Sequence, residues 1–269
     1  MRDTTALASD QLAHWERDGY VLIGEILSPT ECAELVAEEQ RLRPPGGYGT
    51  SPGLVVIDQL SHVSTLVREF CCRGRHLDVV EQLLGEAVTL THNQFVTKLS
   101  APGDHASEIP LHQDDGYGTL DPPEDVTVWV ALTDTTTDNG CLVVAPGSHR
   151  DGFVEHRVAS HNAAFREATA TATEPLELPA GHAVAFSGLL LHGSGDNRTD
   201  AERVALFARY CRPHLVMVTE GGRPVLDDGH SWMVRGEAPM STWRSANTKF
   251  TEASEPETGD RRVLNRRSS

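Results

Sequence analysis

The succession of short apolar segments after residue 86 constrains the fold most. Each segment is rich in β-branched and aromatic residues, and Gly, Pro or Asp residues separate it from the next. Such segments predict strands, which we place within residues 87–99, 125–132, 140–149, 176–186 and 203–211. Several short strands with turn residues between them are typical of a barrel or a sandwich.

The first part of the chain predicts helices instead. We expect short helices within residues 7–19, 28–43, 62–70 and 76–85. The clearest start signal is at Ser28, because Pro29 suits the first helical position and Glu31 completes a capping box. Helices that precede the strands, rather than alternate with them, argue against a parallel βαβ sheet. The predicted class is mainly β with N-terminal helices.

The chain contains no internal repeat and no low-complexity linker that would separate domains. Its 269 residues are a normal length for one large domain of this kind. We therefore predict a single domain over residues 1–269, with a mainly helical part at 1–86 packed on a β core at 87–215. Residues 216–269 form an extension, and we expect its polar last part to be mobile.

Charge and composition limit the partners. The formal net charge is -16 and the pI is near 5.2, which argues against binding nucleic acid or an anionic membrane. No stretch has the length and hydropathy of a membrane span or of a signal peptide. The five cysteines are an odd number without a C-x-x-C pair, so reduced thiols and a cytoplasmic location are expected. A small-molecule substrate is the expected partner, and assembly into a homo-oligomer is a further possibility.

The segment "PLHQDDGY" is the first candidate site. In a strand, His112 and Asp114 would point to the same face. One imidazole and one carboxylate are two of the three protein ligands of the facial triad that binds non-haem Fe(II). In a chain with 13 histidines this pair alone is weak evidence, and a surface histidine in an acidic loop is the alternative.

A second segment, "LLLHGSGDNRTDAERVALFARY", strengthens the metal hypothesis. His192 ends an apolar run and is followed by turn-forming residues, as expected for a ligand at the end of a strand. Arg203 follows 11 residues later and begins the next β-rich segment. A guanidinium there could hold the far carboxylate of a dicarboxylic co-substrate through paired, charge-assisted hydrogen bonds.

Four segments in this order resemble the phytanoyl-CoA dioxygenase family. They are "LHQDDGY", "VTVWVALTDTTTDNGCLVVAPGSH", "PAGHAVAFSGLLLHGSGDN" and "ERVALFARY", and the likeness covers roughly residues 10–215. The resemblance implies an Fe(II)/2-oxoglutarate-dependent oxygenase on a double-stranded β-helix, or jelly roll. It also implies that His112, Asp114 and His192 are the iron ligands.

The resemblance assigns the co-substrate contacts as well. Arg203 corresponds to the residue that pairs with the C5 carboxylate of 2-oxoglutarate, and Ser194 to a hydroxyl bonded to the same carboxylate. Lys98 or the polar cluster of His92, Asn93 and Gln94 lies on the preceding strand, where the family places groups that face the co-substrate. We take Lys98 and Asn93 as candidate contacts.

Candidates for substrate binding each have a structural alternative. They are Gln94, Asp115, Tyr117, Trp129 and Tyr48. Trp129 is as readily a core aromatic, and Asp115 and Tyr117 as readily belong to a plain loop. Tyr48 lies in a Gly/Pro-rich segment that could cover the barrel mouth. His149 is expected to be structural, and Arg209 either structural or a contact for an anionic substrate.

The expected reaction is hydroxylation of an unactivated C–H bond of a small metabolite, with O2 consumed and succinate and CO2 released. A specialised metabolite or an amino acid is the favoured substrate. Related halogenases have Gly or Ala at the carboxylate position, so Asp114 predicts oxygenation. Desaturation, epimerisation or cyclisation are alternative outcomes. A non-catalytic jelly-roll binding protein is the alternative of another class, and a zinc hydrolase is weaker.

Overall fold

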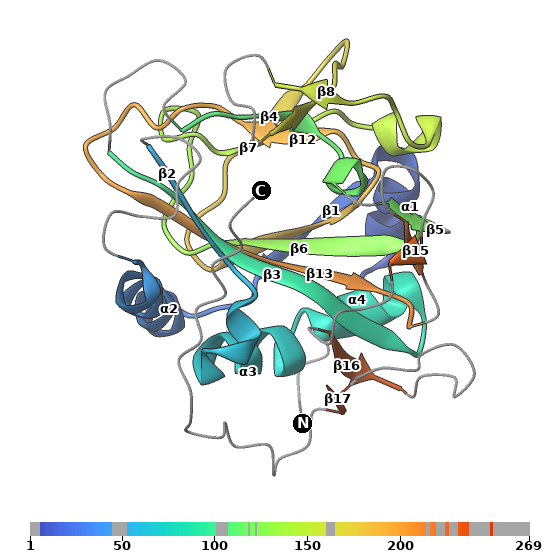
Figure 1. Ribbon diagram of the computed structural model, residues 1–269, viewed down its shortest axis with the longest axis horizontal. Coiled ribbons are helices and arrows are strands. Elements are labelled where there is room, and N and C mark those ends of the chain that lie inside the picture. The colour runs from blue at the N-terminus through green and yellow to red at the C-terminus, as the bar shows by residue number, and fades with distance from the viewer. Residues whose placement is uncertain are drawn as a thin grey trace, which may run out of the picture.

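Two sheets that face each other form the centre of the fold (Figure 1). The large sheet has the strand order β1-β11-β6-β13-β3-β16-β17, with β2 also paired to β3, and the small sheet has the order β10-β7-β12-β4. All pairs in both sheets are antiparallel except β16 with β17. This arrangement matches the predicted jelly-roll core, and the predicted class, mainly β with N-terminal helices, is confirmed.

The computed structural model describes residues 6–44, 53–100, 107–117, 119–121, 123–159, 165–213, 216–218, 224–225, 231–236 and 248–249. The large sheet contains β1 (Tyr20–Glu25), β2 (Leu54–Asp58), β3 (Val88–Lys98), β6 (Asp125–Ala131), β11 (His182–Ser187), β13 (Arg203–Cys211), β16 (Trp232–Arg235) and β17 (Thr248–Lys249). The small sheet contains β4 (Ile109–His112), β7 (Leu142–Val144), β10 (Glu174–Leu176) and β12 (His192–Ser194). Smaller sheets pair β5 (Thr119–Asp121), β14 (Val216–Val218) and β15 (Pro224–Val225), and β8 (Arg157–Val158) with β9 (Arg166–Glu167).

The four predicted helices are present as α1 (Ser9–Asp18), α2 (Pro29–Leu42), α3 (Thr65–Arg73) and α4 (Leu77–Leu84). The predicted capping box is formed, since the Ser28 hydroxyl accepts from the Glu31 amide and the Glu31 carboxylate accepts from the Ser28 amide. Gly19 ends α1 with φ 80, a left-handed conformation that glycine adopts without steric cost. Short 3-10 turns are η1 (Leu60–His62), η2 (Asp114–Tyr117) and η3 (Ser148–Asp151).

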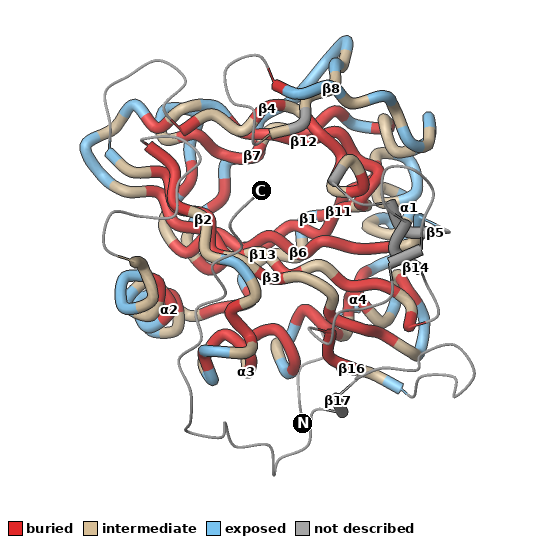
Figure 2. The backbone as a smooth tube through the Cα atoms, viewed as in Figure 1, coloured by how far each residue is buried: buried red, intermediate tan, exposed pale blue. Residues whose placement is uncertain are grey.

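Side chains alternate between two cores along the large sheet. On β13, Val204, Leu206 and Ala208 pack into the core beneath the helices, whereas Ala205 and Phe207 face the core between the two sheets. The central strands are buried on both faces, as the red tube in Figure 2 shows. A strand buried on both faces is a rigid platform, so side chains on its inner face are held in defined positions.

The N-terminal part contributes strands as well as helices. β1 pairs with β11 at one edge of the large sheet, and β2 pairs with β3. The division into three parts within one domain stays a prediction. None of the helices in the described part of the chain has the length and hydropathy needed to cross a bilayer.

Candidate metal centre

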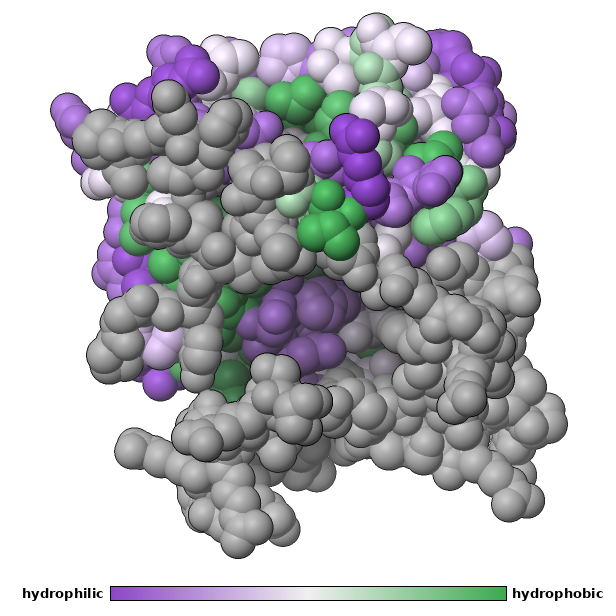
Figure 3. Space-filling model, turned by 45° about the horizontal axis from the view of Figure 1, so that its top comes forward, coloured by the Kyte–Doolittle hydropathy of each residue, from purple (hydrophilic) through white to green (hydrophobic). Residues whose placement is uncertain are grey.

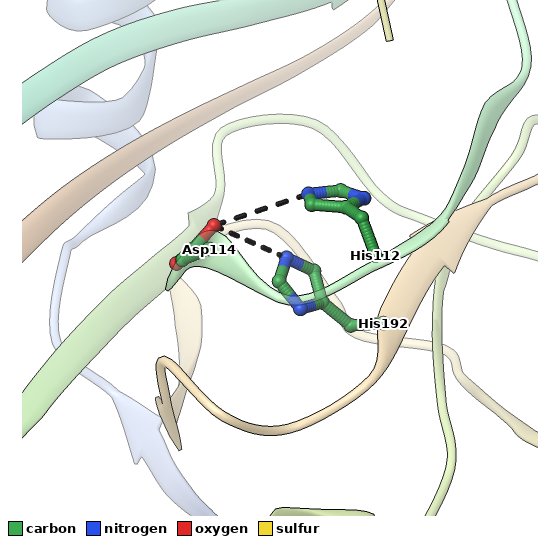
Figure 4. Close-up of side chains that lie close together, drawn as sticks. All are labelled: His112, Asp114 and His192. Atoms are coloured by element: carbon green, nitrogen blue, oxygen red, sulfur yellow. Dashed lines mark ion pairs between the residues drawn. The ribbon is translucent and has the colours of Figure 1, made fainter. Parts of the chain in front are cut away.

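His112, Asp114 and His192 meet at one point between the sheets. His112 ends β4 and His192 begins β12, and the two residues are direct partners in the antiparallel ladder. Asp114 begins η2, two residues beyond the end of β4. One ligand atom from each residue lies within 4.8 Å of the others. Figure 4 shows the three side chains converging, with Oδ1 of Asp114 3.9 Å from Nε2 of His112 and 3.5 Å from Nε2 of His192.

Hydrogen bonds orient each of the three groups. Nδ1 of His112 lies 2.8 Å from the carbonyl oxygen of Pro110, and Nδ1 of His192 lies 2.9 Å from that of Leu190. A carbonyl only accepts, so Nδ1 carries the proton and the lone pair of each neutral ring is on Nε2. Thr127 donates to Oδ2 of Asp114 at 2.5 Å, which turns Oδ1 towards the histidines. This is the arrangement that a metal ion requires of its ligands.

The protonation states also suit a metal. Burial and the nearby His192 ring lower the pKa of His112 to about 3. Burial would raise the pKa of Asp114, but interaction with His192 and the positive charge of Arg209 hold it below its usual range. Near neutral pH the His112 ring is therefore neutral and the Asp114 carboxylate is ionised, and metal ligation needs both.

An ion-pair network next to the site adds negative charge. The Arg209 guanidinium bonds to the buried carboxylates of Asp115 and Asp125, and its Nη1 lies 3.5 Å from the Asp114 carbonyl oxygen. The Asp114 carboxylate lies nearby without bonding to this guanidinium, so the three carboxylates and Arg209 carry two net negative charges when all are ionised. Burial and the neighbouring Asp125 raise the pKa of Asp115. A divalent cation would neutralise this excess, so the residues fit Fe(II).

A second buried feature carries positive charge. Arg203 is 1% exposed, and among the described residues its guanidinium donates only to the carbonyl oxygens of Gly140, at 3.0 Å, and Val96, at 3.4 Å. Its Nε is buried, and no residue in the described part of the chain bonds to it. Burial lowers the pKa of Arg203 to about 9. The guanidinium carbon lies 5.6 Å from the centre of the Trp129 ring. Among the described residues, no carboxylate forms an ion pair with it.

Lys98 lies beside Arg203 as its direct partner on β3. Its ammonium donates to the carbonyl oxygens of Ser107 and Gly195, both at 2.5 Å, and of Ser194, at 3.3 Å. Burial and the Arg203 charge lower its pKa. Two adjacent buried cations, for which the described residues supply no paired acid, form an environment that an anionic ligand would stabilise.

The structure corrects two details of the sequence-based site. Asp114 does not share a strand face with His112, because β4 ends at His112 and the chain turns into η2. Gln113 is buried there and donates to the carbonyl oxygens of Leu189 and Gly152, which fixes the turn. Asn93 points away from the site, since its side chain bonds to Ser61 on the helix side of β3. This placement contradicts its prediction as a co-substrate contact.

The other candidates are placed as follows. Gln94 and Trp129 face the space between the sheets, since each is aligned in register with Phe207. Asp115 is 1% exposed and bound to Arg209. Tyr48 and the side chain of Tyr117 lie outside the described residues. Ser194 is buried in β12, two residues from His192.

Sequence analysis missed the contribution of Thr127 and did not place Arg209. A usable signal was present, because Thr127 alternates with Val126 and Val128, which lie in the core under the helices. A polar residue at that position faces the opposite side of the strand, towards the site. The pairing of Arg209 with Asp115 and Asp125 had no local signal, since these residues are far apart in the chain.

Comparisons with known proteins agree with this geometry. The family model "Phytanoyl-CoA dioxygenase (PhyH)" matches residues 15–205. A probable phytanoyl-CoA dioxygenase of Caenorhabditis elegans is 25% identical over 80% of this chain and 78% of its own length. The ectoine dioxygenase of Nocardia farcinica is 28% identical over 74% of this chain and 76% of its own.

Solved structures show the same fold. The epimerase SnoN, in complex with Fe3+, alpha-ketoglutarate and nogalamycin RO, aligns with a TM-score of 0.69 at 22% identity, covering 84% of this chain and 98% of its own. The carbocyclase SnoK aligns with a TM-score of 0.65 at 20% identity, covering 81% and 93%. The His-Asp-His site fits an Fe(II)/2-oxoglutarate-dependent oxygenase. The family match over most of the chain shows that this protein belongs to the phytanoyl-CoA dioxygenase family of non-haem Fe(II)/2-oxoglutarate-dependent dioxygenases.

Proposed function

We propose that this protein hydroxylates an unactivated C–H bond of a small metabolite and converts 2-oxoglutarate to succinate and CO2. The observation that supports this most is a buried His-Asp-His cluster between the same two sheets as a buried guanidinium with which no described carboxylate is paired. Ferrous iron, when bound with 2-oxoglutarate and O2, supplies the oxidising chemistry. The substrate is a specialised metabolite or an amino acid.

His112, Asp114 and His192 would hold the iron. Their Nε2 atoms and Oδ1 already face one another, and Thr127 and two backbone carbonyls fix their orientation. Because little reorganisation is needed, binding of the metal would not have to order the site first. With three protein ligands, a ferrous ion held here would keep coordination positions for a co-substrate.

Arg203 would hold the C5 carboxylate of 2-oxoglutarate. No described residue bonds to its Nε, so a carboxylate placed there gains a charge-assisted hydrogen bond without displacing one of these residues. Lys98 adds positive charge beside it, and Ser194 would contribute its hydroxyl. The Trp129 ring lies against the guanidinium and stabilises its positive charge in the buried site.

The outcome at the substrate carbon has competing alternatives. A carboxylate at position 114 completes three protein ligands and favours oxygenation over halogenation. Epimerisation, cyclisation and desaturation are the alternatives, since SnoN is described as an epimerase and SnoK as a carbocyclase. Hydroxylation differs from these outcomes because it alone places an oxygen atom from O2 in the modified metabolite.

The test is formation of succinate from 2-oxoglutarate with Fe(II) and ascorbate, with and without pools of small metabolites. We expect Fe(II)-dependent succinate in the wild type and loss of at least about a hundredfold in His112→Ala and His192→Ala. His14→Gln, at a half-buried position of α1 outside the His-Asp-His cluster, is the matched control. Isotopically labelled O2 then separates hydroxylation from the other outcomes. Absence of succinate with every pool would favour a non-catalytic binding protein.

A further inference from the structure

A polar cluster lies on the inner face of β2 and β3. Nε2 of His92 is 3.3 Å from Oδ1 of Asp58 and 3.2 Å from Oε1 of Gln94. The His92 ring lies 5.5 Å from the Phe207 ring, centre to centre, at an interplanar angle of 30°. The His92 side chain is 35% exposed and that of Asp58 is 57% exposed. We call His92, Asp58 and Gln94 the His92 cluster. Its exposed side chains are accessible to a ligand.

The His92 cluster is on the same side of the sheet as the metal centre. Gln94 and Lys98 lie on the same face of β3, and Asn93 lies on the opposite face. His92 is aligned with Arg209, whose Nη1 approaches the Asp114 carbonyl oxygen at 3.5 Å. Arg209 is in turn aligned with Thr127, which donates to Asp114. Neighbouring strands are ~4.8 Å apart, so His92 and Thr127 have Cα atoms roughly 10 Å apart.

Phe207 connects the two sites through apolar contacts. It packs against the core between the sheets, to which Phe186 belongs, and the Phe186 ring lies 4.5 Å from the His192 ring. A molecule that rests on Phe207 and reaches the His92 cluster would therefore lie next to the metal centre. Figure 3 shows a hollow near the middle of the view, with hydrophilic side chains in its floor.

The hydrogen bonds of His92 define what the cluster can recognise. A carboxylate only accepts, so the proton of the neutral ring is on Nε2, which faces Asp58. Nδ1 is then an acceptor, and within the described part of the chain no residue bonds to it. The Asp58 carboxylate has further accepting capacity towards solvent. Two acceptors on an accessible surface suit a ligand group that donates.

We propose that His92 and Asp58 form a substrate-binding subsite for a hydroxyl or protonated amino group, with Phe207 against an apolar part of the same molecule. The subsite rests on the proposed function, because it orients a substrate towards the metal centre. The subsite predicts that the substrate is a neutral or cationic metabolite that carries hydroxyl or amino groups.

Charge argues against an anionic substrate at this place. Asp58 repels phosphate and carboxylate groups, and the chain as a whole is strongly acidic. Arg209 is already bound to Asp115 and Asp125, and the buried Arg203 and Lys98 serve the co-substrate. A coenzyme A thioester, which carries several phosphate charges, finds no available cation among the described residues of this inner face.

The experiment compares wild type with Asp58→Asn and His92→Phe. The first substitution removes the charge at nearly constant shape, and the second keeps an aromatic ring on Phe207 but removes both nitrogens. Glu34→Gln removes an exposed carboxylate charge on α2 and is the matched control. The probes are one panel of amino sugars, aminoglycosides and polyols, and one panel of coenzyme A thioesters. The readout is stimulation of succinate formation and its dependence on probe concentration.

We expect stimulation by members of the amine and polyol panel. Their KM should rise about tenfold or more in Asp58→Asn and His92→Phe, as for the loss of one hydrogen bond to a charged group. It should stay within about twofold of wild type in Glu34→Gln, and the kcat of Asp58→Asn should change less than its KM. Circular dichroism establishes that each variant is folded.

Three results would overturn the subsite. They are stimulation by coenzyme A thioesters alone, a KM that neither variant changes, and no stimulation by any amine or polyol. Substrate-free consumption of 2-oxoglutarate by the wild type tests the proposed function separately. If the proposed function is wrong, the wild type does not consume 2-oxoglutarate in that measurement. If only the subsite is wrong, 2-oxoglutarate is consumed but the amine and polyol panel gives one of the three results above.

Discussion

At the scale of single residues, burial of charge without a protein partner is the main theme of the site. Arg203 is buried, and its partners in the described part of the chain are carbonyl oxygens, so these partners compensate its charge incompletely. Such a group lowers stability unless a ligand pairs with it. Replacing a residue that supports the fold lowers the free energy of unfolding. Replacing a buried cation that serves only to bind a co-substrate should leave the free energy of unfolding of the ligand-free protein unchanged or raise it.

Arg203→Met separates these two effects. We expect the apparent KM for 2-oxoglutarate to rise at least about tenfold, since each hydrogen bond to a charged group contributes roughly 1.5–3 kcal/mol. The co-substrate-free variant should be as stable as the wild type or more stable by about 1–3 kcal/mol, because an unpaired buried charge is removed. Urea unfolding and succinate assays measure the two quantities. A clear loss of stability with unchanged KM would mean that Arg203 is structural.

The protonation of His112 predicts how stability depends on pH. Its pKa is about 3 in the folded protein and near 6.5 when unfolded. Between these values the unfolded state binds the proton and the folded state does not, so the free energy of unfolding falls as pH falls. Above about pH 6.5 this contribution is constant. His76 shows the same lowering through burial, to about 3.

We therefore expect the melting temperature of the metal-free protein to decrease from about pH 6.5 towards pH 4. Thermal unfolding followed by circular dichroism across this range measures it. The decrease should be shallower in His112→Gln, because one of the two buried rings is gone. The raised pKa of Asp115 acts in the opposite direction, so the comparison of the two proteins carries the test. An equal pH dependence in wild type and His112→Gln would contradict the buried neutral state of the His112 ring.

At the scale of elements, one ion-pair network joins the segments that carry the candidate ligands. Arg209 of β13 bonds to Asp125 of β6 and to Asp115 of η2, next to Asp114. The Asp115 amide donates to the Gly188 carbonyl in the segment that leads to His192. Gly188 has no room for a side chain, since a Cβ would lie 2.3 Å from the Asp125 carboxylate. The network thus fixes the position of η2 relative to both sheets.

Arg209→Met should disturb this arrangement. Removal of one partner leaves two buried carboxylates unpaired, and breaking a buried pair costs about 3–5 kcal/mol. We also expect Co(II) affinity to fall at least about tenfold, because Asp114 loses its fixed position. Arg209→Lys, which keeps the charge, should recover part of both losses. A folded Arg209→Met protein with wild-type Co(II) affinity would show that the network does not position Asp114.

At the scale of the whole molecule, the jelly roll brings together groups that are far apart in the chain. The His112–His192 pair joins two adjacent strands of the small sheet, and Thr127 reaches Asp114 from the large sheet. The excess negative charge and the adjacent buried cations have opposite signs, so metal and diacid would stabilise the fold together. Stability of the molecule should therefore depend on its ligands.

Mn(II) and 2-oxoglutarate together should raise the melting temperature, and a chelator should reverse the effect. A ligand at a hundred times its Kd adds about 2.7 kcal/mol to the free energy of unfolding. Differential scanning calorimetry with each ligand alone and with both measures the contribution. The shift should be absent in His192→Ala. An equal shift in that variant would place the metal elsewhere.

Local patterns determined much of this protein. The capping box at Ser28, the stop at Gly19 and the β-rich segments after residue 86 all appear where the sequence predicts them, because they depend on neighbours in the chain. The candidate ligand types and the spacing from His192 to Arg203 were equally visible. Family resemblance added the identity of the metal and the co-substrate.

Tertiary structure alone decided which side chains share the space between the sheets. Asn93 and Gln94 are adjacent and both polar, yet the pairing of β3 with β13 turns Asn93 to the helices and Gln94 to the site. The contacts of Arg209 with Asp115 and Asp125, and of His92 with Asp58, join residues separated by 34 or more positions. Such contacts depend on strand register and sheet packing, which no short stretch of sequence encodes.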